Sequence, residues 1–176
     1  EEALAYYKGG FAALANRMRD EVIKLGGEIR LEEPATGLKT EGGKVTHVVS
    51  SSGELAVDAV LATPAFPLIA DLVEGHVGED FIAKLRRVNY LANKCLVLEL
   101  DRSLSDTYWL NVNDPGFPFV GVIEHTNFEP VESYGGSHIV FLSRYLAHTD
   151  PVYEMNADEL FSYALPHLQR MFPDFD

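Results

Sequence analysis

The stretch YKGGFAALANRMRDEVIKLGGEIRL, residues 7–31, holds a helical pattern with a glycine pair at each end. Gly9-Gly10 precedes the pattern, and Gly26-Gly27 follows it. Gly26 suits the left-handed position that ends a helix, and the run EIRL at 28–31 then predicts a short strand. The apolar side chains between the glycine pairs recur at the spacing of an amphipathic helix: Phe11, Leu14, Ala15, Met18, Val22 and Leu25.

The next part of the chain, residues 37–63, predicts three strands joined by glycine-centred turns. The turns are expected at Gly42-Gly43 and at Ser52-Gly53. The run AVLATP at 59–64 is nearly all apolar, which is typical of a strand buried on both faces. Two short helices are then expected, at about 68–74 and 79–88.

From residue 90 the pattern changes to consecutive strands. Runs typical of strands, without long helices between them, indicate an antiparallel sheet. A closing helix is expected at 157–171, with Asn156 as its N-cap and Pro166 as the site of a kink. The predicted fold class is therefore α+β, with a boundary near residue 70. The four strand-like runs are 90–101, 107–112, 118–128 and 137–147.

Composition excludes several classes of function. The 176-residue chain is 47% hydrophobic, so it can form a packed core, and its net charge of −13 disfavours nucleic acid as a partner. No apolar run has the length of a membrane span. Cys95 is the single cysteine, which excludes a disulfide framework and favours a cytoplasmic setting. No histidine has metal-ligand spacing to another histidine or carboxylate, so no metal site is expected.

An ordered series of motifs resembles the flavin-containing amine oxidase superfamily, which includes protoporphyrinogen oxidases, phytoene desaturases and UDP-galactopyranose mutases. The first glycine pair and its helix are followed by GGEIRLEEPATGL at 26–38, GGKVTHVVSSSGE at 42–54 and DAVLATPA at 58–65. A looser match continues through WLNVNDPGFPFVGVIEHTNF at 109–128 and the Tyr134-Gly135-Gly136 turn, most like the protoporphyrinogen-oxidase-like members.

The resemblance implies a division of labour along the chain. Residues 1–70 would be part of an FAD domain, made of a helix, a strand and a β-meander, and residues 71–176 would be a substrate-binding domain. The family's N-terminal GxGxxG motif is not present, so the chain is expected to be an internal fragment that does not retain FAD alone. The positions matching the family's cofactor contacts are Ala35, Thr63 and Pro64.

Aromatic and polar side chains in the second half suggest a pocket for a flat or apolar substrate, although each also fits ordinary packing. The period of two puts His125 and Asn127 on one strand face with Phe119, Gly121 and Ile123, where Gly121 leaves room for a ligand. No catalytic residue can be named. The substrate-binding candidates are Tyr108, Asn111, His125, Asn127 and Tyr145.

The leading hypothesis is a fragment of an FAD-dependent oxidoreductase that transfers hydride from a carbon of an organic substrate to flavin. Its partners would be a small-molecule substrate and the remaining FAD-domain segments of the parent chain. One alternative is a flavin-dependent nucleotide-sugar mutase, which needs arginines that clamp a diphosphate. The candidates for that clamp are Arg86, Arg87, Arg102 and Arg144. The other alternative is a stand-alone, non-catalytic binding domain without flavin.

Overall fold

The computed structural model describes residues 5–176, which form two compact units that meet at Asn89–Tyr90. This division lies further along the chain than the boundary predicted near residue 70. The difference arises because helix α2 (Phe66–Val73) packs against both strand β1 (Ala35–Glu41) and helix α3 (Glu79–Arg86). Both helices therefore belong to the first unit.

The first helix, α1 (Gly10–Lys24), ends as its sequence predicts. Gly26 has a φ of 87°, and its amide donates to the carbonyl of Ile23. The amide of Gly27 donates to the carbonyl of Val22. These two bonds form a Schellman motif, which occupies carbonyls that the last turn of a helix leaves without a partner. The helix has no buried residue.

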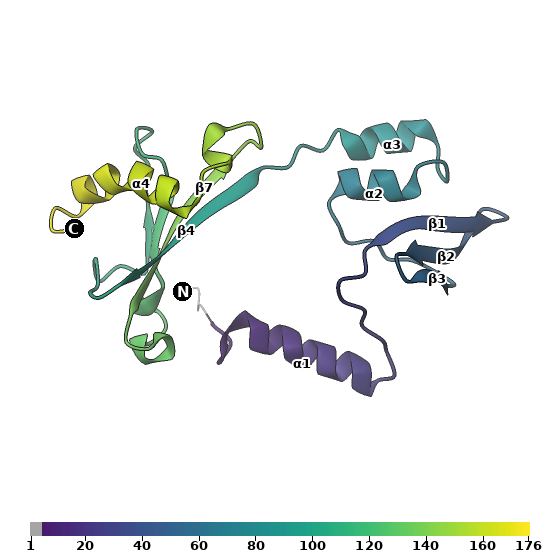
Figure 1. Cartoon of the computed structure of the whole chain (residues 1–176), viewed down its shortest axis with the longest axis horizontal. Coiled ribbons are helices and arrows are strands. Elements are labelled where there is room, and N and C mark those ends of the chain that lie inside the picture. The colour runs from purple at the N-terminus through teal and green to yellow at the C-terminus, as the bar shows by residue number, and fades with distance from the viewer. Residues whose placement is uncertain (1–4) are drawn as a thin grey trace. The chain divides into compact units, whose positions relative to one another are not determined.

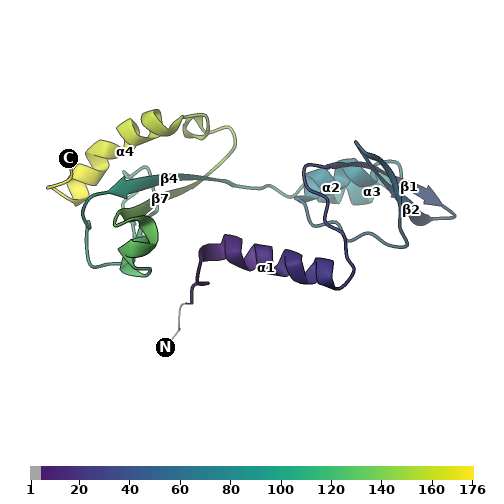
Figure 2. The same ribbon diagram turned by 60° about the horizontal axis from the view of Figure 1, so that its bottom comes forward.

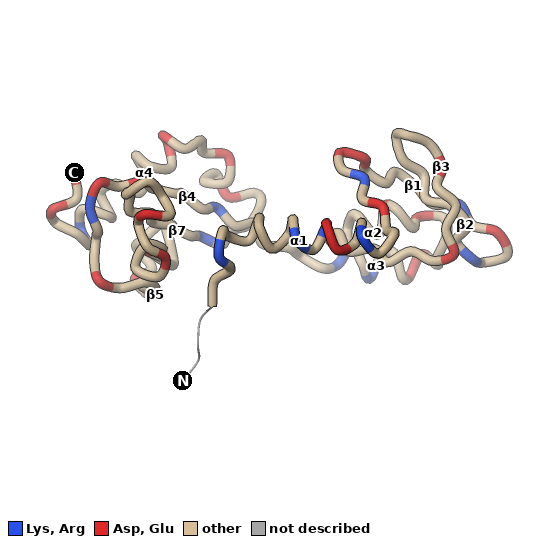
Figure 3. The backbone as a smooth tube through the Cα atoms, turned by 90° about the horizontal axis from the view of Figure 1, so that it is seen from below, with Lys and Arg blue, Asp and Glu red and all other residues tan. Residues whose placement is uncertain are grey.

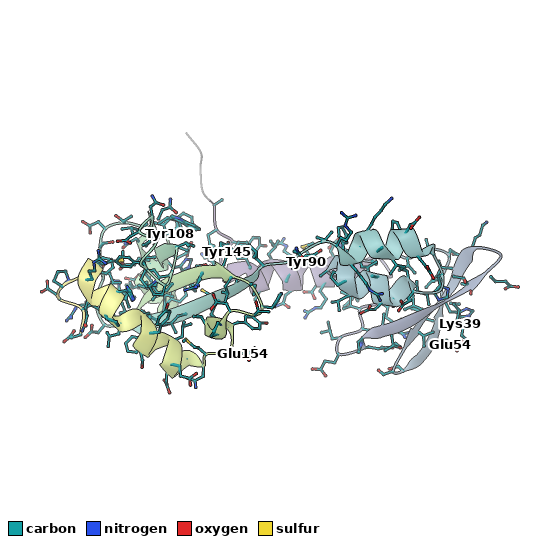
Figure 4. All side chains as sticks on the ribbon, turned by 90° about the horizontal axis from the view of Figure 1, so that it is seen from above. Lys39, Glu54, Tyr90, Tyr108, Tyr145 and Glu154 are labelled. Atoms are coloured by element: carbon teal, nitrogen blue, oxygen red, sulfur yellow. The ribbon has the colours of Figure 1, made fainter. Side chains whose placement is uncertain are left out.

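Strands β1, β2 (Lys44–Ser50) and β3 (Gly53–Ala56) form the predicted antiparallel meander (Figure 1). Gly42 and Gly43 both have positive φ, as a tight hairpin turn requires. Across the meander, Lys39 Nζ lies 2.5 Å from Glu54 Oε1, and Figure 4 labels both side chains. The two short helices, α2 and α3, are also confirmed.

Two predicted strands of the first unit are wrong. The segment EIRL at 28–31 is irregular and exposed. The side chain of its Arg30 forms an ion pair with Glu28 of the same segment. AVLATP at 59–64 is irregular as well, and Leu61 is 90% exposed. Within residues 5–176 neither run has a strand beside it, and a strand needs a hydrogen-bonding neighbour to form.

The second unit contains the predicted antiparallel sheet, in the order β4-β7-β6-β5. Each neighbouring pair is antiparallel, and β4 and β7 are paired over their whole length, from Ala92↔Leu146 to Leu100↔His138. The strands are β4 (Ala92–Leu100), β5 (Trp109–Asn111), β6 (Gly121–Glu124) and β7 (His138–Leu146).

Helix α4 (Ala157–Met171) covers one face of this sheet (Figures 1 and 2). Leu168 and Ala164 from the helix pack into the core with Val122, Val140 and Leu142 from the sheet. Asn156 is the predicted N-cap: its side chain accepts from the amide of Glu159, whose carboxylate accepts from the amide of Asn156. The helix continues unbroken through Pro166.

The fold class is α+β, as predicted, with four α-helices and two antiparallel sheets in the described residues. Acidic and basic residues are interspersed along both units (Figure 3). No helix within residues 5–176 is long and apolar enough to cross a membrane.

Candidate functional site

The sheet of the second unit has a second face, opposite α4, which we call the open face. The strand register places an apolar row across all four strands, Val97↔Phe141↔Ile123↔Trp109, on this face. Trp109 and Val97 are each 55% exposed, in contrast to the buried side chains under α4. A sheet that leaves such apolar side chains uncovered is a candidate binding surface.

A more polar row lies beside the apolar one. It runs Cys95↔Ser143↔Gly121↔Asn111, and Tyr145 follows on the same face of β7 with 64% exposure. The indole Nε1 of Trp109 donates to Asn111 Oδ1 at 2.9 Å, which links the two rows. Gly121 adds no side chain at the centre of the face, but the residue is itself buried, so the room for a ligand that the sequence predicted there is not present. The open face thus combines aromatic surface with oriented polar groups.

Of the five predicted substrate residues, Asn111 and Tyr145 lie on the open face. Tyr108 immediately precedes β5 and is half-buried, with its ring centroid 5.0 Å from that of Phe128. Tyr108 and Tyr145 are labelled in Figure 4. Tyr145 lines a cavity together with Val112 and Tyr163, and Asn111 is not among the lining residues of that cavity. The role of these two residues in substrate binding stays a prediction.

The predicted strand row through His125 and Asn127 is wrong. Strand β6 ends at Glu124, and His125–Asn127 form a single 3₁₀ turn, η1, which breaks the period of two. Phe119 also leaves the row, because it packs in the core on the α4 side of the sheet, whereas the register places Gly121 and Ile123 on the open face.

His125 is buried, with 7% of its surface exposed. Its Nε2 lies 2.6 Å from the hydroxyl oxygen of Tyr134, a hydrogen-bonding distance, and its ring packs edge-on to Phe141 of the apolar row. Burial lowers the pKa of His125, and the nearby charge of Glu129 opposes this effect in part. The ring of His125 therefore supports the end of the open face through its contact with Phe141.

Asn127 is exposed and holds a loop. Its Nδ2 donates to the carbonyl of Ser105 at 2.6 Å and to the carbonyl of Thr107 at 3.2 Å. These bonds account for both side-chain donors, so the amide group connects η1 to the segment that leads into β5.

Glu124 is a residue that the sequence analysis did not select. Only 1% of its surface is exposed, and its carboxylate accepts hydrogen bonds from the amides of Leu104 and Ser105. His138 Nδ1 lies 3.6 Å away from Oε1. The sequence could have indicated Glu124 as an acidic residue two positions after Val122, where the alternation of β6 places side chains toward the core.

Comparison with known proteins agrees with the motif series. The whole chain, residues 1–176, matches the family described as flavin containing amine oxidoreductase. The chain belongs to the flavin-containing amine oxidoreductase family. No curated protein matches it by sequence.

Solved structures of similar fold include an oxidoreductase from Methanosarcina mazei, with 20% identity, a TM-score of 0.76, and coverage of 94% of this chain and 40% of the other. A protein assigned as a protoporphyrinogen oxidase from Exiguobacterium sp. 255-15 has 16% identity, a TM-score of 0.71, and coverage of 93% and 36%. A protein from Pyrococcus furiosus has 13% identity, a TM-score of 0.67, and coverage of 94% and 40%. This member of the amine oxidoreductase family thus spans well under half the length of these structures.

The predicted cofactor positions of this amine oxidoreductase all lie in the first unit. Ala35 begins β1 opposite Ser50, and Thr63 and Pro64 come just before α2; all three are exposed. They can offer backbone or small side-chain contacts to an adenine or ribose. Within residues 5–176, no glycine-rich turn joins a strand to the start of a helix, so the described residues do not form a cradle for the pyrophosphate of FAD.

Most of the arginines that could form the diphosphate clamp of a nucleotide-sugar mutase form ion pairs within the chain. Arg86 pairs with Asp71 and Glu74. Arg102 pairs with Asp176, and Arg144 lies 2.9 Å from Asp150. A diphosphate that bound to these arginines would replace the carboxylates as their partners.

Proposed function

We propose that the chain forms the substrate-side part of an FAD-dependent oxidoreductase. When bound, the flavin accepts hydride from a carbon of an organic substrate. The residues of this chain bind and orient that substrate on the open face. The proposal is supported by the family membership and, above all, by a sheet whose one face is packed under α4 while the other exposes Trp109, Val97 and Tyr145.

The rows of the open face suggest the kind of substrate. A flat, mostly apolar molecule would lie along the apolar row and displace water from its surface. A polar group on the same molecule would meet Asn111 or Ser143 in the neighbouring row. A cytoplasmic setting belongs to this proposal and is supported by the lone cysteine.

Trp109 is the only tryptophan of the chain and therefore a direct reporter of this face. We expect a neutral, mostly apolar aromatic compound, N-phenyl-1-naphthylamine, to quench its fluorescence saturably. Val97→Glu should weaken this binding by about tenfold or more, because a charge in the apolar row must be desolvated on contact. The matched control is Val77→Glu, a partly exposed valine of the first unit.

The proposal is contradicted if the wild-type chain shows no saturable quenching. It is also contradicted if the two valine variants bind the probe equally well, because the probe would then contact Trp109 without using the apolar row. A stand-alone binding domain would show the same quenching but no turnover in any flavin-loaded protein that contains this chain.

A further inference from the structure

We propose that Glu124 and Asn127 are positioning residues that set Tyr108 and Trp109 on the open face by clamping the loop 103–107. Glu124 is buried at the end of β6, and Asn127 lies beyond that strand in η1. The consequence for ligand binding rests on the proposed function, whereas the clamp itself rests on the hydrogen bonds alone.

Glu124 holds the donors of the loop. Its two carboxylate oxygens each lie 3.2 Å from the amide nitrogen of Leu104, and Oε2 lies 3.0 Å from the amide nitrogen of Ser105. A carboxylate with 1% exposure is costly without such bonds, so the loop and the charge stabilise each other.

Asn127 holds the acceptors of the same loop, through the carbonyls of Ser105 and Thr107. The backbone of Ser105 is thus bound at its amide by Glu124 and at its carbonyl by Asn127. Because the two side chains have opposite hydrogen-bonding character, they fix both the position and the direction of the chain at this residue.

The clamp leads directly into the open face. Thr107 precedes Tyr108, whose carbonyl accepts from the amide of Glu124 at 2.9 Å. The next residue is Trp109, the outer member of the apolar row. β5 is only three residues long and lies at the end of the strand order, so few other bonds determine where its aromatic side chains stand.

The clamp is tested first in the chain without any ligand. Asn127→Ala removes the two hydrogen bonds that Asn127 donates to the loop carbonyls, at an exposed position. Glu124→Gln replaces the carboxylate by an amide with a single acceptor oxygen. We expect amide exchange at Leu104 and Ser105 to rise by about tenfold in each variant, and the emission and acrylamide quenching of Trp109 to change. Asn113→Ala and Glu132→Gln are matched controls at exposed positions.

The same variants test the effect on binding. With exchange in β4 and β7 unchanged, we expect Asn127→Ala to weaken binding of N-phenyl-1-naphthylamine by about threefold to tenfold, because Trp109 is no longer held in place. Glu124→Asp, which keeps the charge but is shorter, should bind the probe more weakly than wild type and more tightly than Glu124→Gln.

The outcomes separate the two proposals. If the wild-type chain does not bind the probe, the substrate role of the open face fails, while exchange and Trp109 emission still decide the clamp. If Asn127→Ala leaves both the exchange of Ser105 and the emission of Trp109 at the wild-type values, the clamp is overturned. If Glu124→Gln does not fold, Asn127→Ala decides the clamp by the same two measurements.

Discussion

His125 couples the stability of the second unit to pH. Its pKa is lowered in the folded state, chiefly because the ring is buried beside Tyr134 and Phe141. In the unfolded chain the ring takes up its proton near the ordinary pKa of 6.5. The unfolded state therefore binds more protons between the two pKa values, so the stability that His125 confers is present above pH 6.5 and is lost as pH falls below it.

We predict that His125→Gln removes part of the loss of stability that occurs as pH falls below 6.5. Denaturant unfolding at a series of pH values measures the slope. His148→Gln is the control, because His148 is exposed. A slope that is equal in wild type and His125→Gln would show that this ring does not cause the pH dependence.

At the residue scale, the sequence predicted the face of the strand on which a side chain lies better than it predicted the contacts that the side chain makes. The alternation of β6 correctly predicts inward and outward side chains up to Glu124, but it cannot reveal where the strand ends. His125 and Asn127 follow that end, so the predicted strand row is wrong at these two substrate-binding candidates. The clamp was not predictable, because the partners of Glu124 lie about twenty positions earlier in the chain.

At the element scale, the end of α1 depends on Gly26. A φ of 87° is costly for any residue with a Cβ. Because a Cβ added at Gly26 would meet no other atom within 4 Å, a substitution there tests backbone strain without a steric clash. We predict that Gly26→Ala costs about 1 kcal/mol or somewhat more, seen as faster amide exchange at Gly27 and in the last turn of α1. Gly37→Ala in β1, where φ is not positive and the nearest atom would be 3.8 Å away, should have little effect.

The two faces of the second sheet should respond differently to truncation. Leu168 of α4 is fully buried, so Leu168→Ala should destabilise the second unit by about 2–5 kcal/mol through the cavity it leaves. Val97→Ala on the open face should cost about 0.5 kcal/mol. Chemical denaturation of both variants measures the difference. Equal losses would mean that the open face is packed as tightly as the covered one.

Elements were predictable where the local sequence contains its own boundaries. Gly26, the Gly42-Gly43 turn and Asn156 mark ends that short-range hydrogen bonds enforce, and α1, the meander and α4 agree with them. The runs 28–31 and 59–64 failed for a different reason. A run typical of a strand indicates that a segment can be extended and partly buried, but the neighbouring strand that it needs is not contained in the run.

At the scale of the whole molecule, we predict that the 176-residue chain expressed by itself does not retain FAD. The described residues offer exposed contacts at Ala35, Thr63 and Pro64 but no turn that binds a pyrophosphate. Absorbance of the purified chain in the flavin bands, after addition and removal of excess FAD, measures retention. A stoichiometric yellow product would contradict this prediction and would require an unrecognised cradle.

The pairing of β4 with β7 also sets the order in which the chain acquires structure during synthesis. In the meander, each strand meets its partner across a turn of a few residues, so these hairpins can close within microseconds of leaving the ribosome. Strand β4 must wait until β7 has been made, because Leu100 pairs with His138 and Ala92 with Leu146. Closing that long loop slows folding, and until it closes β4 is an unpaired edge on which a chaperone could act.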